Sequence, residues 1–233
     1  MHQNNISSLK DERVARLLVG LFINADYEEP IQIEYRYDSR TGFNIFTRIQ
    51  NRDYYLSGNR YFDVMSELLD QLPASSKIII HHRVFLHKEG KKEIVELEEH
   101  LYPYEIRNTA TVMYQIKFSY QGKVYETHPS SEFGGSSGTR GGVLEELRSM
   151  IDGNFVLGVC YFCRYLVDVN MYGGTDYRHD QLYCFRDKQD ALIEIEKKYP
   201  RLFGLEDLVN TGTANMSSLH GCASFSYQAK PRP

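Results

Sequence analysis

The sequence predicts an α+β fold in which antiparallel meander sheets pack with a few helices, ahead of a cysteine-bearing C-terminal third. Segments that alternate apolar and polar residues recur between short polar turns, which is the pattern of half-buried strands. Aromatic residues make up 13% of the 233 residues, with 18 Tyr, 12 Phe and no Trp, and such side chains favour strands. A few segments show helical spacing, and each of them ends at Pro or at Asp-Gly.

Strands are expected from the start of the N-terminal part. Residues 14–24 suit either a helix or a strand, because periodicity alone does not separate the two. Residues 31–37 alternate apolar with polar side chains and predict a strand, and residues 43–49 follow across a turn as a second one. A further turn at Asn51 leads into a short strand at residues 54–56. Together these segments predict an antiparallel meander.

One helix and further strands are expected after this meander. Apolar residues at helical spacing predict a helix over residues 62–72, which a proline ends. Residues 77–87 predict a strand, and residues 109–120 predict another that turns at Gln121-Gly122-Lys123 into a hairpin. The acidic segment at residues 93–104 fits no single element, and its residues 96–100 are interpreted as a solvated acidic face.

A glycine- and serine-rich segment divides the chain. Residues 128–142 hold five glycines and four serines, a composition typical of flexible loops. We predict an α+β strand-rich region at residues 1–130 and a cysteine-containing α+β region at residues 141–233, packed on the first as one unit. Whether the Gly/Ser-rich loop at residues 134–142 is functional or a linker stays open.

The C-terminal region is predicted to contain helices around a hairpin. Residues 144–151 share an apolar face at helical spacing. Residues 155–163 are expected to form a buried strand whose partner is the strand at residues 181–185. Asp187 is expected to cap a following helix, which Pro200 ends.

Four cysteines in this region raise the question of a structural zinc site. Such a site takes four thiolate or imidazole ligands in a tetrahedron, and a C-x-x-C pair lets two thiolates converge. The candidate metal ligands are Cys160, Cys163, Cys184 and Cys222. Against a metal, side chains three residues apart on a regular strand point to opposite faces. Buried thiols that act as small hydrophobic side chains, and a redox C-x-x-C pair, stay open as alternatives.

The cysteine-bearing third resembles a family of uncharacterised bacterial proteins. Members of that family carry a C-x-x-C segment, a short Tyr-Gly loop, a Cys-Phe-Arg strand and a C-terminal Cys-x-x-Phe element. The matching residues are Cys160, Cys163, Tyr172-Gly173, Cys184-Phe185-Arg186-Asp187, Cys222, Phe225 and Pro231-Arg232-Pro233. No activity is assigned to the family, so the resemblance implies that the cysteines group together and implies no reaction.

Composition argues against several classes of protein. The net charge of −4 and the pI of about 6.1 argue against a nucleic-acid partner bound through phosphate neutralisation. No secretory signal precedes the first strand, and no apolar run is long enough to span a bilayer. Four cysteines are too few for a disulfide scaffold, so we expect reduced thiols or metal ligands. These observations predict a cytoplasmic protein with no membrane partner.

No catalytic residue is assigned from the sequence. It contains no H-E-x-x-H helix or dinucleotide fingerprint, and the glycine-rich loop lacks the lysine of a P-loop. His81 and His82 are adjacent on a predicted strand and so face opposite ways.

The predicted function is non-enzymatic protein binding in a bacterium, as an immunity protein that neutralises a toxin or as a phage-defence component. Abundant tyrosine favours recognition surfaces, because a Tyr side chain buries a large area at small entropic cost. The alternative is a metal- or thiol-dependent enzyme that uses the cluster of Cys160, Cys163, Cys184 and Cys222.

Overall fold

The structure is a computed structural model of the chain, and it describes residues 14–38, 42–58, 61–73, 75–106, 109–131, 138–151, 155–159, 162–163, 166–168, 182–198 and 213–215. Most of these residues lie in antiparallel strands, and the described helices are short, which confirms the α+β class. The described helices are α1 (Tyr61–Asp70), α2 (Gly138–Met150), α3 (Gln189–Lys198) and the 3-10 turn η3 (Arg186–Lys188). The described strands are β1 (Val14–Ile23), β2 (Glu28–Asp38), β3 (Gly42–Ile49), β4 (Arg52–Gly58), β5 (Lys77–Lys88), β6 (Lys91–Ile106), β7 (Thr109–Tyr120), β8 (Lys123–Glu126), β9 (Ser130–Ser131), β10 (Val156–Leu157), β11 (Leu166–Asp168), β12 (Leu182–Cys184) and β13 (Thr213–Asn215).

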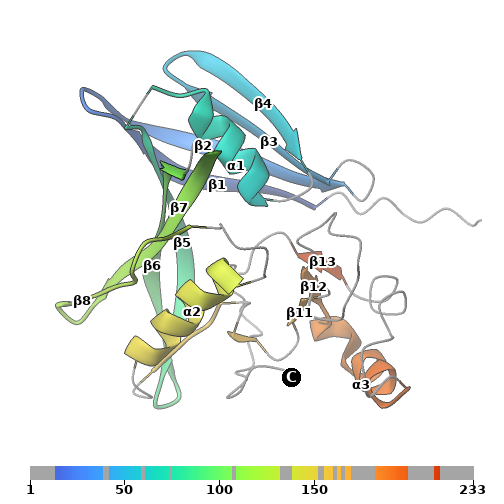
Figure 1. The fold of residues 1–233 in the computed structure, drawn as a ribbon. Helices are drawn as coiled ribbons and strands as arrows, with labels where there is room; N and C mark the ends of the chain where they lie inside the picture. The colour runs from blue at the N-terminus through green and yellow to red at the C-terminus, as the bar shows by residue number, and fades with distance from the viewer. Residues whose placement is uncertain are drawn as a thin grey trace, which may run out of the picture.

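A 10-stranded sheet holds most of these strands (Figure 1). Its main path runs β4-β3-β2-β1-β5-β6-β7-β8, while β9 pairs with β7 and β10 pairs with β5. All of its strand pairs are antiparallel. The sheet therefore consists of two meanders, β1–β4 and β5–β8, which join where the first half of β5 pairs with β1. The segment at residues 14–24, which the sequence left open between helix and strand, is strand β1.

Tight turns set the register of three hairpins in this sheet. Each turn consists of two consecutive residues with positive φ, namely Gln50 and Asn51 (51° and 61°), Glu89 and Gly90 (48° and 79°), and Gln121 and Gly122 (51° and 77°). This backbone is that of a type I′ turn, whose twist matches the twist of the strands on either side. The hairpin predicted at Gln121-Gly122-Lys123 is confirmed, and the turn predicted at Asn51 starts one residue earlier.

Alternate residues of the strands face an inner side of the sheet, which the helices α1 and α2 cover. Ile33 of β2, Ile45 of β3 and Leu97 of β6 are at most 2% exposed and share one core with Met65 and Leu68 of α1. Helix α1 contacts β3 and β4 near one end of the sheet and also β6 and β7 of the second meander. The sheet therefore curves around α1, and burial of the apolar face of α1 stabilises both meanders at once.

Helix α2 closes the same core beside β7 and β8 (Figure 1). Its residues Leu144 and Leu147 are fully buried there. The prediction that the glycine-rich segment is a loop as far as residue 142 is wrong at its end, because α2 already begins at residue 138. Burial of the two leucines outweighs the low helix propensity of the glycines in the first turns.

The pairing predicted in the C-terminal region is also wrong. Strand β10 lies within the segment 155–163, yet its partner is β5, where Val156 pairs with His87. Strand β12 pairs instead with β11 and β13 in a separate 3-stranded sheet. Asp187 lies in η3, and its carboxylate accepts hydrogen bonds from Arg186. The limits of the two predicted regions stay a prediction, while α2 and β10 of the second region pack on the sheet of the first.

Candidate interaction surface

The outer face of the first meander carries a row of four side chains, three of them exposed and one half-buried, which we call the aromatic row. The row consists of Leu17, Glu34, Phe46 and Tyr55, one from each of the strands β1 to β4, and each is the direct cross-strand partner of the next. Leu17 is 61% exposed, Phe46 40% and Tyr55 69%. Phe46 and Tyr55 are direct neighbours, while Glu34 separates them from Leu17. Large side chains that are exposed next to each other are typical of an interaction surface, whereas single exposed ones are ordinary.

The local sequence explains why these side chains point outwards. In β3 the inner positions are occupied by Phe43, Ile45, Thr47 and Ile49, all buried. Phe46 lies between them and must face the opposite side, because successive side chains of a strand alternate. In β4, Tyr54 is buried and the adjacent Tyr55 faces out for the same reason. The row is therefore fixed by the strand period and by the register of the hairpins.

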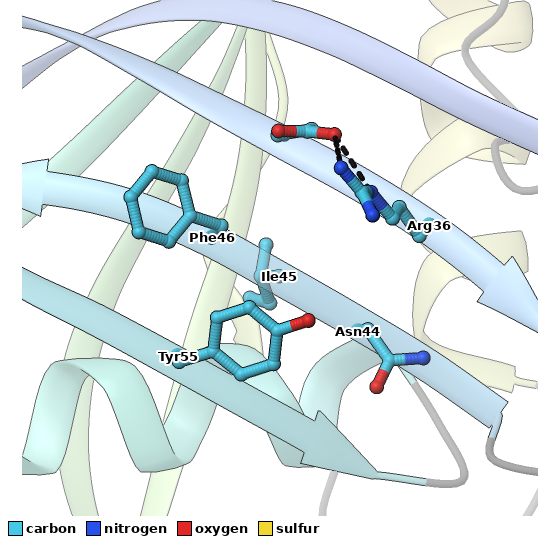
Figure 2. A pocket seen from close by; sticks show the side chains of 6 residues that line it. Arg36, Asn44, Ile45, Phe46 and Tyr55 are labelled. Atoms are coloured by element: carbon cyan, nitrogen blue, oxygen red, sulfur yellow. Dashed lines mark hydrogen bonds and ion pairs between the residues drawn. The ribbon is translucent and has the colours of Figure 1, made fainter.

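A shallow hollow of about 250 Å³ lies beside three members of the row, Glu34, Phe46 and Tyr55 (Figure 2). Its lining comes from β2, β3 and β4, and consists of Glu34, Arg36, Asn44, Ile45, Phe46 and Tyr55. The rings of Phe46 and Tyr55 lie 6.2 Å apart at 52° to each other, and form one wall. Small-molecule sites usually measure about 300–1,000 Å³ and enclose their ligand. The size and shape of this hollow suit a single protruding side chain better.

An ion pair borders the hollow on one side. The guanidinium of Arg36 contacts one carboxylate oxygen of Glu34 through two nitrogens, at 2.7 Å and 2.6 Å. The hydrogen bond from Arg36 to Glu34 raises the pKa of the guanidinium further above its usual value. The amide of Asn44 and the hydroxyl of Tyr55 lie at the same rim (Figure 2). An apolar centre with a polar rim is the usual arrangement of a protein–protein interface.

The outer face of the second meander is built differently, because its polar side chains pair with one another. His81 lies 3.0 Å from Glu96 and His100 lies 2.6 Å from Glu98, measured between ring nitrogen and carboxylate oxygen. Gln115 donates to the carboxylate of Glu126 at 3.0 Å and to a backbone carbonyl. His100 and Gln115 are both buried on this side. Burial lowers the pKa of His100 and outweighs the opposing effect of Glu98, so the imidazole stays neutral near pH 7.

A cluster of three hydrogen-bonded polar side chains lies in the core, on the inner side of the second meander. The Nε2 atom of His82 lies 2.7 Å from Glu99, and the hydroxyl of Tyr61 donates to the same carboxylate at 3.2 Å. Glu99 is 1% exposed and His82 6%. The interpretation of residues 96–100 as a solvated face is therefore wrong, since Glu99 and His100 are buried on opposite sides of β6. These two contacts connect Tyr61 of α1 to Glu99 of β6, and Glu99 to His82 of β5.

The structure brings two of the four predicted metal ligands into view. Cys163 is buried at 6% exposure, and Cys184 is half-buried as the last residue of β12. Neither of them forms a disulfide. Cys160 and Cys222 lie outside the described residues. Within those residues no group of three or more His, Cys, Asp or Glu side chains is arranged to hold a metal ion. The zinc site stays a prediction, which metal analysis of protein purified without added zinc would test.

The aromatic row was not predicted from the sequence. Two features of the sequence point to it. Tyr54 and Tyr55 are adjacent, and only one of them can face the core; the segment of β1 is apolar at both its odd and its even positions, so some apolar side chains must face outwards. Neither signal gives the order of the strands, and the order is what brings Leu17, Phe46 and Tyr55 into one row.

Comparisons of the chain with family models, with curated proteins and with solved structures gave no match. The resemblance of the cysteine-bearing third to a bacterial family therefore stays a prediction. Among the helices that the structure describes, none has the length and apolar character needed to cross a bilayer.

Proposed function

We propose that this protein acts without catalysis, by binding another protein through the aromatic row. We propose that this binding neutralises a bacterial toxin or assembles a phage-defence complex. The observation that carries this proposal is the exposed pair of Phe46 and Tyr55 beside a hollow that fits one side chain. A folded domain that keeps two neighbouring rings in water gains little folding stability from their exposed parts, so binding is the better explanation of their placement.

The physical chemistry of the row suits a protein partner. Aromatic side chains dominate binding energy at interfaces, because each buries a large area and has few torsions to order. Phe46 and Tyr55 already contact each other and sit on a regular sheet, so little conformational entropy remains to be lost on binding. The ion pair of Arg36 and Glu34 offers hydrogen-bonding groups at the rim without a net charge of its own.

The experiment uses the full chain as bait in a lysate of its native host, followed by purification of the recovered protein. Affinity is then measured for the wild type and for the variants Phe46→Ala and Tyr55→Ala. Truncation of a central aromatic side chain removes about 2 kcal/mol or more of binding free energy, so each variant is expected to bind about 30-fold more weakly.

The matched control is Tyr27→Ala, which removes an exposed tyrosine outside the row. It is expected to keep the wild-type affinity. The Phe46–Tyr55 contact contributes at most about 1 kcal/mol to folding, so both row variants are expected to stay folded in denaturant titration. If the row variants bind as tightly as the wild type, or if no protein partner is recovered, the proposal is wrong.

A further inference from the structure

Strand β4 forms one end of the sheet, and its outward edge has no pairing strand among the described residues. The two edges of the main path differ. Strand β8 at the opposite end has only four residues and carries Lys123 and Glu126. Strand β4 has seven residues in unbroken register with β3, contains no proline, lysine or bulge, and presents Tyr55 at its centre. Short length and lysine protect edges from pairing, and β4 lacks both.

The turn before β4 shows which of its backbone groups point outwards. Residues that flank a two-residue type I′ turn form a hydrogen-bonded pair, here Ile49 and Arg52. Hydrogen-bonded pairs recur at every second position, so Tyr54, Leu56 and Gly58 also bond to β3. The intervening residues of β4 direct their N–H and C=O groups away from β3. These residues are Asp53, Tyr55 and Ser57.

We infer that β4 pairs antiparallel with β4 of a second copy of this chain across a two-fold axis at Tyr55. The three outward-directed residues are symmetric about Tyr55, so an antiparallel copy pairs Asp53 with the partner's Ser57 and Tyr55 with the partner's Tyr55. Each of these pairs exchanges both N–H···O bonds. A shift of the register by two residues leaves one of the three without a partner.

The side chains are compatible with this symmetric register. Asp53 faces a serine hydroxyl and not a second carboxylate, and Arg52 faces Gly58. Tyr55 faces its own copy, as an aromatic cross-strand pair of the kind that stabilises sheets. An isologous interface of this type needs one self-complementary segment, and β4 provides it. The aromatic row then continues from one protomer into the other, which doubles the surface available to a partner protein.

The test is sedimentation equilibrium of the purified full chain over a wide range of concentration. A monomer–dimer equilibrium is expected for the wild type. Two substitutions at one exposed position shift the dissociation constant of the dimer in opposite directions. Ser57→Lys places an ammonium group opposite Asp53 at two symmetric sites and lowers the dissociation constant several-fold. Ser57→Asp places a carboxylate opposite Asp53 at the same two sites and raises it several-fold. Tyr55→Lys sets two like charges face to face and abolishes the dimer.

The matched control is Lys123→Glu on the opposite edge, which is expected to leave the dimer unchanged. A wild type that stays monomeric at every concentration overturns the inference. So does a dimer in which Ser57→Lys and Ser57→Asp shift the dissociation constant in the same direction, or do not shift it. The measurement needs no second protein, so its failure leaves the proposed partner binding untouched and is distinguishable from it.

Discussion

The two meanders of the sheet use their outer faces in different ways. Over β1–β4 the outer side chains include the exposed neighbours Phe46 and Tyr55, and the exposed Leu17 beyond the half-buried Glu34. Over β5–β7 the outer side chains include histidines, carboxylates and amides that pair with each other and are partly buried, beside the exposed Ile94 and its cross-strand partner Phe85. Polar groups that satisfy one another fix a structure, whereas exposed apolar groups remain available to a partner. We therefore expect the paired polar side chains of the second meander to contribute chiefly to folding stability. We expect Phe46 and Tyr55 of the first meander to contribute chiefly to binding.

The inner faces show the same difference. Core positions on β2 and β3 are apolar or aromatic apart from Thr47, whose hydroxyl bonds to a backbone carbonyl of β2. On β5 and β6 the core includes the His82–Glu99 pair, which Tyr61 joins from α1. Removing one member of a buried polar pair leaves the other without its partner at low dielectric. Substitutions in the second meander therefore test folding, and substitutions on the aromatic row test binding.

The largest effect is expected from His82→Leu in β5. This change leaves the Glu99 carboxylate buried without the imidazole, which costs about 3–5 kcal/mol of folding free energy. Urea denaturation measures the loss as a lower midpoint at unchanged slope. Tyr55→Ala provides the comparison, because the side chain is 69% exposed and makes one cross-strand contact.

The double variant His82→Leu/Glu99→Leu is the control for this prediction. It removes both members of the pair, and is expected to regain a large part of the lost stability because no unpaired charge remains in the core. If His82→Leu unfolds at the same urea concentration as the wild type, the stabilising role given to the second meander is wrong.

A smaller effect is expected from lowering the pH, which should reduce folding stability through two histidines of the second meander. Burial lowers the pKa of His100, and burial together with Lys92 lowers the pKa of His87. At these two imidazoles, the unfolded chain therefore binds more protons than the folded chain below about pH 6.5. The contribution of His87 and His100 to the free energy of unfolding is therefore fully present above about pH 6.5. It is lost as the pH falls towards their lowered pKa values.

Urea denaturation at a series of pH values between about 7.5 and 5 measures how steeply the free energy of unfolding falls with pH. His100→Gln is the matched variant, because its amide can still donate to Glu98 but does not titrate. The variant is expected to lose less stability on acidification than the wild type. Equal slopes for the two proteins would contradict the assignment to His100.

Local patterns in the sequence predicted most of the first meander and none of its surface. The alternation in residues 31–37 and 43–49 correctly gave β2 and β3, because the strand period is a local property. The aromatic row depends on which strands are neighbours and in what register, and both follow from pairing between distant residues. Leu17 and Tyr55 are 38 positions apart by their residue numbers, so no local pattern relates them.

The errors have the same origin. Glu99 and His100 look solvated in an acidic segment, and are buried because His82 and Glu98 pair with them. The segment 155–163 was expected to pair within its own region, but β10 adds to the part of β5 that β1 leaves uncovered. Tertiary partners decide such cases, and they override the local preference of the chain.

The central claim is that the aromatic row is the surface that binds a protein partner. Side-chain oxidation by hydroxyl radicals tests it directly, with the purified partner present or absent and at a chain concentration low enough to keep the protein monomeric. The account predicts that Phe46 and Tyr55 are protected in the complex, while Tyr27 and Ile94, which are exposed elsewhere, react as before. Protection of Tyr27 or Ile94, with Phe46 and Tyr55 still fully reactive, would contradict it.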